Sequence, residues 1–249
     1  MCLIVVGWRV HADFPLLVVA NRDEFHARPT APAARWPEAP QVIGGRDLEA
    51  GGTWLGITDH GRFAAVTNVR EPGVAPGPLS RGGLTRDFLL SDRPAADYAR
   101  EIAGNSYSGF NLLLADGKDL LYCSNRITQP RVLPPGIHGV SNHRLDTPWP
   151  KLQTARQKFA EALPGLPDES AFFALLADRS IVADENLPHT GVPLEWERLL
   201  SAVFVQSPSY GTRASTVLWQ RSDGSIRLHE RSFAANGDLL QSSVISTAV

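Results

Sequence analysis

LLVVANRDE, the sequence of residues 16–24, joins five apolar residues directly to four polar ones. A second apolar run, residues 3–10, precedes it across the polar, proline-containing segment 11–15. Two short runs that are rich in β-branched residues and separated in this way predict paired β-strands. If the pair is antiparallel, the end of the second strand lies near the start of the first, which brings Asp23 close to Cys2.

The polar end of this predicted strand has two interpretations. Asn and Asp favour turns, so residues 21–24 fit a strand that runs out into solvent. On an extended strand, Asn21 and Asp23 instead point to one face and Arg22 to the other. A carboxylate on the first face would orient a neighbouring amine and help to balance its charge.

Cys2 stands directly after the initiator methionine. Removal of Met1 would give Cys2 both a thiol nucleophile and a free α-amine, whose ordinary pKa of about 7.7–8.0 makes it a usable base at neutral pH. The alternative is that Cys2 is a small buried residue of an apolar strand, which is the common role of a free cysteine. We assign that structural role to Cys123, which ends the apolar run 120–123.

The remainder of the chain alternates predicted strands and helices. Hairpins are predicted where two apolar runs flank a turn with Gly after a polar residue, at residues 54–68, 110–124 and 216–230. Helical periodicity covers residues 84–102, with a break at Pro94, and residues 150–163, 169–177 and 193–203. The proline-rich segments 28–40 and 72–78 are predicted to be surface loops. This order predicts one domain of layered sheets covered by helices.

The composition argues against several classes of protein. Lys and Arg number 24, and Asp and Glu number 26, so no strong field favours nucleic acid or an anionic membrane surface. Two cysteines provide no disulfide framework, and no segment approaches the ~18 apolar residues of a membrane span. The N-terminus lacks the basic region of a signal peptide. We therefore expect a soluble protein of the reducing cytoplasm.

The motifs of the common catalytic and metal sites are missing. The sequence contains no GxSxG elbow, no phosphate-binding loop, no HExxH and no GxGxxG. His138 and His143 lie in one turn-rich stretch, but no third ligand is readable nearby. We expect no metal site and no required cofactor.

A set of ordered motifs extends over nearly the whole chain. It consists of Met1-Cys2, NRDE at 21–24, GGTWLG at 51–56, Thr67-Asn68, GFNL at 109–112, Ser141-Asn142 and LDTPWPK at 145–151. Together these motifs resemble the NRDE family, also called transport and Golgi organisation protein 2. That family is in turn similar to N-terminal-nucleophile hydrolases of the choloylglycine hydrolase and penicillin acylase type. The resemblance implies an α+β fold over residues 1–249, a four-layer αββα sandwich of two mainly antiparallel sheets.

The resemblance to those hydrolases also implies a catalytic site. Cys2 matches the nucleophile, Asp23 the aspartate that contacts its amine, and Asn142 an asparagine that holds the oxyanion of the tetrahedral intermediate. Asn68 lies where a second oxyanion contact is expected. Arg213 matches a late arginine near the nucleophile, which would lower the pKa of the thiol through its charge. Taken alone, Asn68 and Asn142 also fit turn residues, and Arg213 also fits a solvated charge at a strand end.

One position departs from the hydrolase pattern. Those enzymes carry an arginine three residues before the aspartate, where this chain has Ala20, and Arg22 is expected on the opposite strand face from Asp23. We assign Asn21, Arg22 and Trp54 to ligand binding.

Two functions remain open at this point. The first is hydrolysis of a non-peptide C–N amide bond in a small molecule by an N-terminal cysteine. The second is non-catalytic binding and trafficking of haem or of an acyl-lipid or acyl-CoA on the same scaffold, as the NRDE resemblance implies. The two hypotheses share one cleft and differ over whether Cys2 performs chemistry.

Overall fold

The computed structural model describes residues 2–247 and contains two antiparallel sheets between layers of helices. The six-stranded sheet has the order β10 (Gly136–Val140), β1 (Cys2–Trp8), β2 (Leu16–Phe25), β11 (Tyr210–Gln220), β12 (Ile226–Phe233) and β13 (Leu239–Ser246). The seven-stranded sheet has the order β3 (Thr30–Trp36), β4 (Ala39–Asp47), β5 (Leu55–Thr58), β6 (Phe63–Asn68), β7 (Phe110–Ala115), β8 (Leu120–Ser124) and β9 (Arg131–Val132).

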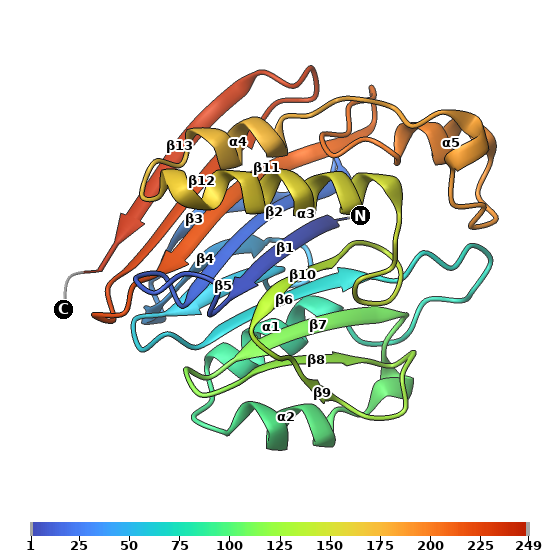
Figure 1. The fold of residues 1–249 in the computed structure, drawn as a ribbon. Coiled ribbons are helices and arrows are strands. Elements are labelled where there is room, and N and C mark those ends of the chain that lie inside the picture. Colours follow the sequence, from blue (N-terminus) through green and yellow to red (C-terminus); the bar gives the residue numbers. More distant parts are fainter. Residues whose placement is uncertain (1, 248–249) are drawn as a thin grey trace.

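The helices cover the outer faces of the two sheets (Figure 1). The six-stranded sheet carries α3 (Pro150–Ala162) and α4 (Ser170–Leu176), whereas α1 (Arg81–Leu89) and α2 (Ala95–Glu101) lie against the seven-stranded sheet. The short helix α5 (Leu194–Leu199) lies at one end of the molecule. Single 3₁₀ turns are η1 (Gly104–Ser106), η2 (Leu163–Gly165) and η3 (Asp184–Asn186). No helix within residues 2–247 has the length and apolar character needed to cross a membrane.

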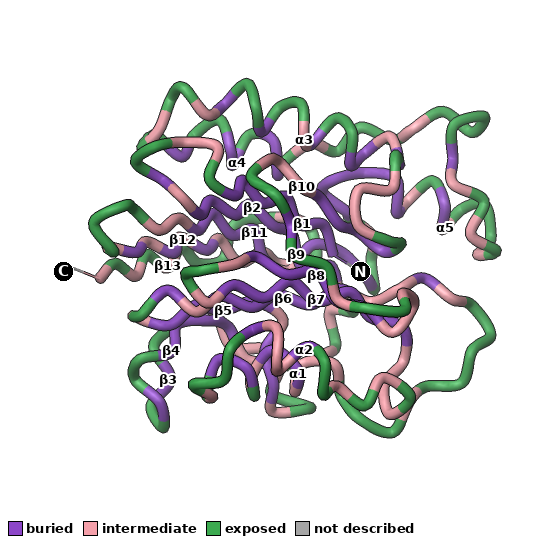
Figure 2. Tube along the Cα trace, turned by 60° about the horizontal axis from the view of Figure 1, so that its bottom comes forward, coloured by how far each residue is buried: buried purple, intermediate pink, exposed green. Residues whose placement is uncertain are grey.

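The pairing of β1 with β2 lies inside the six-stranded sheet, with β10 on one side and β11 on the other. Cys2 is the cross-strand partner of Arg22, and Ile4 is the partner of Ala20. Ile4 and Val18 belong to the core between the two sheets, together with side chains of the seven-stranded sheet. Because both faces of these strands are covered, their sequences are continuous apolar runs and not alternating ones. Figure 2 shows these central strands as the most buried part of the chain.

The second core lies between the six-stranded sheet and α3. Pro150 starts this helix at a position where a missing N–H costs nothing, and Leu152, Ala155 and Phe159 form its buried face. Phe159 reaches the backbone of β1 at Gly7, where an added Cβ would lie 3.0 Å from the ring. Gly7 therefore permits α3 to pack directly on the strand that begins with Cys2.

The prediction of a surface loop at residues 28–40 is wrong, because this segment contains β3 and the turn to β4. β3 is an edge strand, and its register with β4 shifts between Ala31 and Ala34. Pro32 lies inside that irregularity, and an edge strand tolerates a residue without an N–H at such a point. The predicted helix at 84–102 divides into α1 and α2 at Pro94, which caps α2. Residues 72–78 lie outside helices and strands, as predicted.

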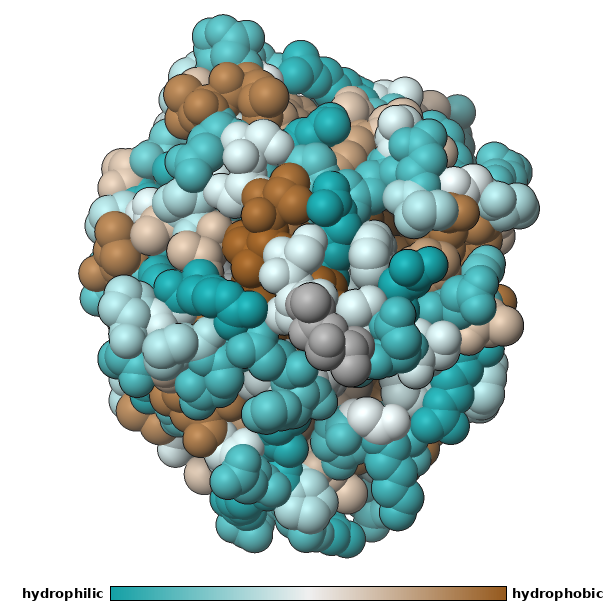
Figure 3. Space-filling view, turned by 90° about the vertical axis from the view of Figure 1, so that its left-hand side faces the viewer, coloured by the Kyte–Doolittle hydropathy of each residue, from teal (hydrophilic) through white to brown (hydrophobic). Residues whose placement is uncertain are grey.

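The outer surface is mixed in character. On the face that carries the C-terminal end of the chain, hydrophobic side chains form separate small groups among hydrophilic ones (Figure 3). The apolar surface that stabilises the fold therefore lies mainly in the two internal cores.

Replacement of Phe159 by Ala should lower the free energy of unfolding by about 3–5 kcal/mol, because the ring is fully buried between α3 and β1. Urea unfolding followed by circular dichroism measures this change. Leu48→Ala, at an exposed position, is the matched control and should change stability by less than about 0.5 kcal/mol. A small effect at Phe159 would contradict the packing described here.

Candidate functional site

A cleft of about 460 Å³ opens beside the start of β1. Its wall includes the side chains of Cys2, Arg22, Trp54, Asn68 and Arg81. These residues come from β1, β2, the segment before β5, the end of β6 and the start of α1. The cleft therefore draws on both sheets and on the connection that follows β6.

Cys2 is buried at the inner end of this cleft, with 8% of its surface exposed. Its carbonyl accepts a hydrogen bond of 3.0 Å from the Ser141 hydroxyl, which fixes the first residue of β1 against the end of β10. The Asp23 backbone N–H donates a hydrogen bond to the thiol sulfur, and the charge of Arg22 also favours the thiolate. Burial outweighs these effects and raises the pKa of the Cys2 thiol above its ordinary value. The thiol therefore requires a base to become a nucleophile.

Asp23 lies next to Cys2, as the antiparallel pairing predicts. Its carboxylate accepts a hydrogen bond of 2.7 Å from the Thr212 hydroxyl, and its carbonyl accepts one of 3.0 Å from the Tyr210 hydroxyl. Burial raises the pKa of the Asp23 carboxyl, while the charge of Lys151 acts in the opposite direction. The neighbouring β11 thus holds Asp23 in place through two hydroxyl groups.

The two predicted oxyanion residues lie in contact. The Asn142 amide N–H groups donate to the Asn68 side-chain oxygen at 2.9 Å and to the Asn68 carbonyl at 3.2 Å. The Ser141 hydroxyl, which also donates to the Cys2 carbonyl, shares its proton with the Asn142 side-chain oxygen at 3.1 Å, so both ends of this buried amide have partners. Asn68 lines the cleft, whereas Asn142 does not belong to its wall. In this geometry Asn68 is the donor available to a ligand, and Asn142 orients it.

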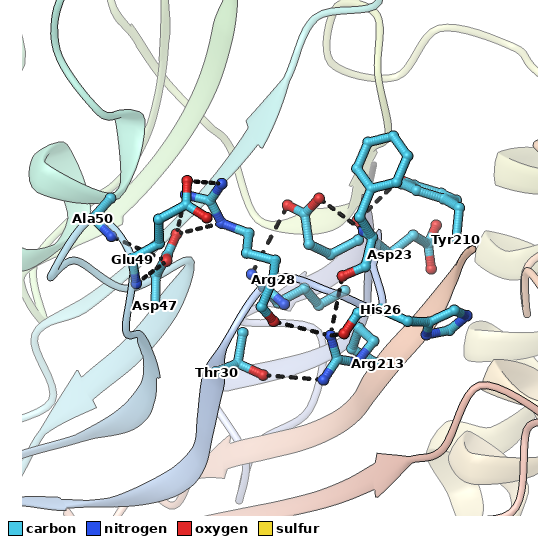
Figure 4. A network of polar contacts seen from close by, with 12 residues as sticks. Asp23, His26, Arg28, Thr30, Asp47, Glu49, Ala50, Tyr210 and Arg213 are labelled. Atoms are coloured by element: carbon cyan, nitrogen blue, oxygen red, sulfur yellow. Dashed lines mark hydrogen bonds and ion pairs between the residues drawn. The ribbon is translucent and has the colours of Figure 1, made fainter.

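Arg213 lies outside the wall of the cleft that contains Asn68 and Asp23. Its guanidinium donates to the carbonyls of Phe25, His26 and Arg28 and to the Thr30 hydroxyl (Figure 4). It lines a neighbouring cavity of about 160 Å³ and not the cleft that holds Cys2. Arg213 therefore holds the connection from β2 to β3.

Arg22 is the cation that faces Cys2. It is the cross-strand partner of Cys2, and its side chain lies on the opposite strand face from Asp23, as strand alternation predicts. Arg22 lines both cavities, and its nearest carboxylate is Glu24 at 3.9 Å. Its Nη1 atom is buried without a hydrogen-bond partner among the described residues.

The two other residues predicted to bind ligand differ in their surroundings. Trp54 lines the cleft and packs against the core between the sheets. Asn21 is fully buried, donates to the carbonyls of Leu176 and Val203 at 2.8 and 2.9 Å, and accepts from the Ser215 hydroxyl at 2.6 Å. Asn21 thus joins the sheet to the end of α4 and lies outside the cleft wall.

Two cations of the site were missed by the sequence reasoning. Arg81, the first residue of α1, lines the cleft and donates to the Gly109 carbonyl at 3.1 Å. Burial lowers the pKa of Arg81, and the charge of the Cys2 thiolate opposes that effect. Lys151, in the first turn of α3, donates to the Leu200 carbonyl at 2.8 Å. Burial lowers the pKa of Lys151 to about 8, and the charges of Asp23 and Cys2 act against this.

Only one of these two residues had a signal in the sequence. Lys151 ends the LDTPWPK motif at residues 145–151, whereas nothing around Arg81 pointed to the cleft. Among residues 2–247, no group of three or more His, Cys, Asp or Glu side chains is arranged to hold a metal ion.

The rim of the cleft is a polar network. Arg28 donates to Asp47 at 3.0 and 2.8 Å and to Glu49 at 2.9 Å (Figure 4). Asp47 in turn accepts the backbone N–H groups of Glu49 and Ala50. Arg28 is thus neutralised by its own neighbours, and Arg22 and Arg81 are the other two cations of the cleft wall.

Comparison with known proteins identifies close relatives. Residues 1–235 match the sequence model of a family described as Transport and Golgi organisation 2. A Transport and Golgi organization protein 2 homolog of Bos taurus is 38% identical over 241 residues, covering 88% of this chain and 87% of that protein. The Homo sapiens homolog is 36% identical over 240 residues, again covering 88% and 87%.

A solved structure of similar fold is a mutant conjugated bile acid hydrolase from Clostridium perfringens. It matches with a TM-score of 0.52 and 10% sequence identity, over 98% of this chain and 92% of that one. This likeness and the two antiparallel sheets confirm the predicted α+β sandwich.

Replacement of Lys151 by Met should change how stability depends on pH. Lys151 has a pKa of about 8 in the folded protein and an ordinary, higher pKa in the unfolded chain. Between these two pKa values the unfolded chain binds more protons, so stability rises with pH. The wild type should therefore gain about 2 kcal/mol of unfolding free energy relative to the variant between pH 7.5 and 9.5. Urea titrations at several pH values measure this difference.

Lys158→Met on the same helix is the control, because Lys158 is half-exposed and paired with Asp178. It should show no such gain over this pH range. Parallel pH profiles for the wild type and Lys151→Met would contradict the buried, easily deprotonated lysine.

Proposed function

The chain belongs to the Transport and Golgi organisation 2 family, and from the geometry of its cleft we propose that it is an N-terminal-nucleophile hydrolase of small-molecule amides. The observation that carries this proposal is the position of the Cys2 thiol. It faces Arg22 across the strand pair, accepts the Asp23 N–H, and shares the cleft wall with Asn68. A nucleophile, a carboxylate and an amide donor thus converge at the start of one strand.

The reaction begins after removal of Met1, which exposes the α-amine of Cys2. The amine takes the thiol proton, and the thiolate attacks the carbonyl carbon of a non-peptide C–N bond. Asp23 orients the amine as its ammonium form develops, and the charge of Lys151 favours the ionised form of the Asp23 carboxyl against the effect of burial. This arrangement supplies the base that the buried thiol requires.

The tetrahedral intermediate places a negative charge on the former carbonyl oxygen. The Asn68 amide donates to this oxygen, and Asn142 holds Asn68 in orientation. The ammonium of Cys2 then gives its proton to the leaving nitrogen as the C–N bond breaks, which leaves a thioester. Water, deprotonated by the amine, hydrolyses the thioester and restores the thiol.

The raised pKa of the thiol favours a second candidate function. A thiol that stays protonated is a poor nucleophile, and a cleft lined by two largely buried arginines fits an anionic ligand without any reaction. Arg22 and Arg81 suit the phosphates or carboxylate of an acyl-lipid or acyl-CoA, and equally the carboxylates of haem. The alternative is thus a non-catalytic carrier that uses the same cleft.

Cys2→Ala should abolish amide hydrolysis, with kcat reduced below detection, because no other group in the cleft supplies a nucleophilic sulfur. Cys123→Ala is the matched control, since Cys123 is buried on the other sheet and burial raises its pKa to about 12. Turnover of a panel of N-acyl amides, labelling by a thiol-directed acylating probe and intact mass measure the outcome. Retained Met1 together with unchanged turnover in Cys2→Ala would refute the hydrolase.

Arg81→Met should weaken the binding of haem or of a long-chain acyl-CoA about 10–100-fold, since a charged hydrogen bond is lost in a buried cleft. Calorimetry on the Cys2→Ala protein measures this affinity without turnover. Arg86→Met on the same helix is the control, because Arg86 is exposed and paired with Asp87. Absence of measurable binding to either ligand would count against the carrier.

A further inference from the structure

Three polar side chains form a hydrogen-bonded chain, and two of them, Glu169 and His229, line a cavity separate from the Cys2 cleft. His229 lies in β12, Ser242 in β13, and Glu169 immediately before α4. The His229 Nδ1 atom lies 2.6 Å from the Glu169 carboxylate, and its Nε2 atom lies 2.8 Å from the Ser242 hydroxyl oxygen. No residue lines both this cavity and the cleft of Cys2.

The fold fixes the histidine in this position. Leu228 and Glu230 of β12 are buried, so strand alternation directs His229 to the side of the sheet that α4 covers. Phe173 of α4 contacts the imidazole edge to face, with the ring centroids 4.6 Å apart. The imidazole is therefore held between the sheet and the helix.

Hydrogen bonds also fix the position of the Glu169 carboxylate. Glu169 is buried, with 9% of its surface exposed, and its second oxygen accepts a hydrogen bond of 2.8 Å from the Arg227 Nε atom. Arg227 and His229 are alternate residues of β12 and share one face of the strand. Each oxygen of the carboxylate thus has a defined partner, which fixes the direction of its bond to the imidazole.

This order of groups is that of a nucleophile, a base and an orienting acid. When Nδ1–H donates to Glu169, the Nε2 atom carries the lone pair and accepts the Ser242 O–H. Ser242 is exposed on an edge strand, so its oxygen is open to a solvent-borne substrate. His229 provides the required base at hydrogen-bond distance.

A cation lies next to the serine. Arg231 is the cross-strand partner of Ser242, so the two side chains share one face of the strand pair. Its guanidinium lies 3.8 Å from the centroid of the Phe173 ring and forms no ion pair within residues 2–247. Arg231 thus offers an unneutralised positive charge where negative charge would develop during attack by Ser242.

The cavity beside these groups has a volume of about 510 Å³. Phe173 and Trp219 provide apolar surface in its wall. The guanidinium groups of Arg221, Arg227 and Arg231 outnumber the carboxylates of Asp168 and Glu169 there. Such a wall suits a small molecule with an apolar body and a negatively charged group.

We propose that Ser242, His229 and Glu169 form a second, serine-dependent site that hydrolyses small carboxylic esters bearing an anionic group. The Ser242 oxygen bonds to the ester carbonyl carbon while its proton passes to His229 Nε2. The bond from that carbon to the alkoxy oxygen then breaks, and the alcohol leaves with the proton from His229. Water, giving its proton to His229, attacks the acyl-serine, and the carboxylic acid is released as Ser242 recovers its proton.

A fluorophosphonate probe tests the nucleophile, in the full chain carrying Cys2→Ala so that the cleft thiol cannot contribute. Intact mass should show one adduct, and peptide mapping should place it on Ser242. Addition of Ser242→Ala should remove the adduct, whereas the matched control Ser243→Ala, at the adjacent residue, should retain it. An unlabelled parent protein, or equal labelling after Ser242→Ala, would overturn the proposal.

Ester hydrolysis tests the base and the specificity in the same background. His229→Gln should reduce kcat for 4-nitrophenyl hydrogen succinate about 10²–10⁴-fold, the usual contribution of a general base. Arg231→Met should raise KM or lower kcat for this anionic ester more than for neutral 4-nitrophenyl acetate. Equal turnover in His229→Gln would refute the site. Because amide hydrolysis by Cys2 is absent from this background, failure here and failure of the amide hydrolase are separate results.

Discussion

The register between β1 and β2 is the constraint on which the rest of the structure depends. Pairing of Cys2 with Arg22 sets the inward face of both strands, and a shift by one residue would send every core side chain to the opposite face. The same register places the Asp23 N–H on the thiol sulfur and turns the Asp23 side chain toward β11. The core and the candidate site are therefore two results of a single alignment, which explains why apolar and polar residues follow each other so abruptly in residues 16–24.

Strand periodicity was enough to predict the part of the site that comes from one hairpin. The proximity of Asp23 and Cys2, and the direction of Arg22, follow from antiparallel pairing and alternation alone. The contact between Asn68 and Asn142 needed more, because it joins a strand of one sheet to the end of a strand in the other. Motif order suggested both residues, but which amide meets the ligand depends on a hydrogen bond that no pattern of residues encodes.

The features that escaped prediction depend on long-range packing. Arg81 and Lys151 reach the site from helices on opposite outer faces of the sandwich. A lysine near the start of a helix is ordinarily exposed to solvent, so its sequence position did not indicate a buried site. The strand β3 was hidden by Pro32 and by the prolines that flank it, and Pro32 is acceptable because no further strand pairs beyond β3. The resemblance placed Arg213 near the nucleophile, yet its guanidinium donates to three backbone carbonyls at the end of β2 and in the connection that follows it. In each case the local sequence is compatible with several surroundings, and tertiary contacts select one.

The contact between Gly7 and Phe159 bears on the position of the Lys151 ammonium, because both Phe159 and Lys151 belong to helix α3. Helix α3 is continuous, and the eight residue steps from Lys151 to Phe159 span about 12 Å along its axis. The contact of the Phe159 ring with Gly7 thus sets how closely helix α3, including its first turn, packs against β1. A methyl group at position 7 would lie 3.0 Å from the Phe159 ring, which is tighter than ordinary packing, so the ring and the helix that carries it would have to shift. Gly7 therefore links the packing of β1 to the helix whose first turn carries Lys151, an ammonium that interacts with the Cys2 thiol.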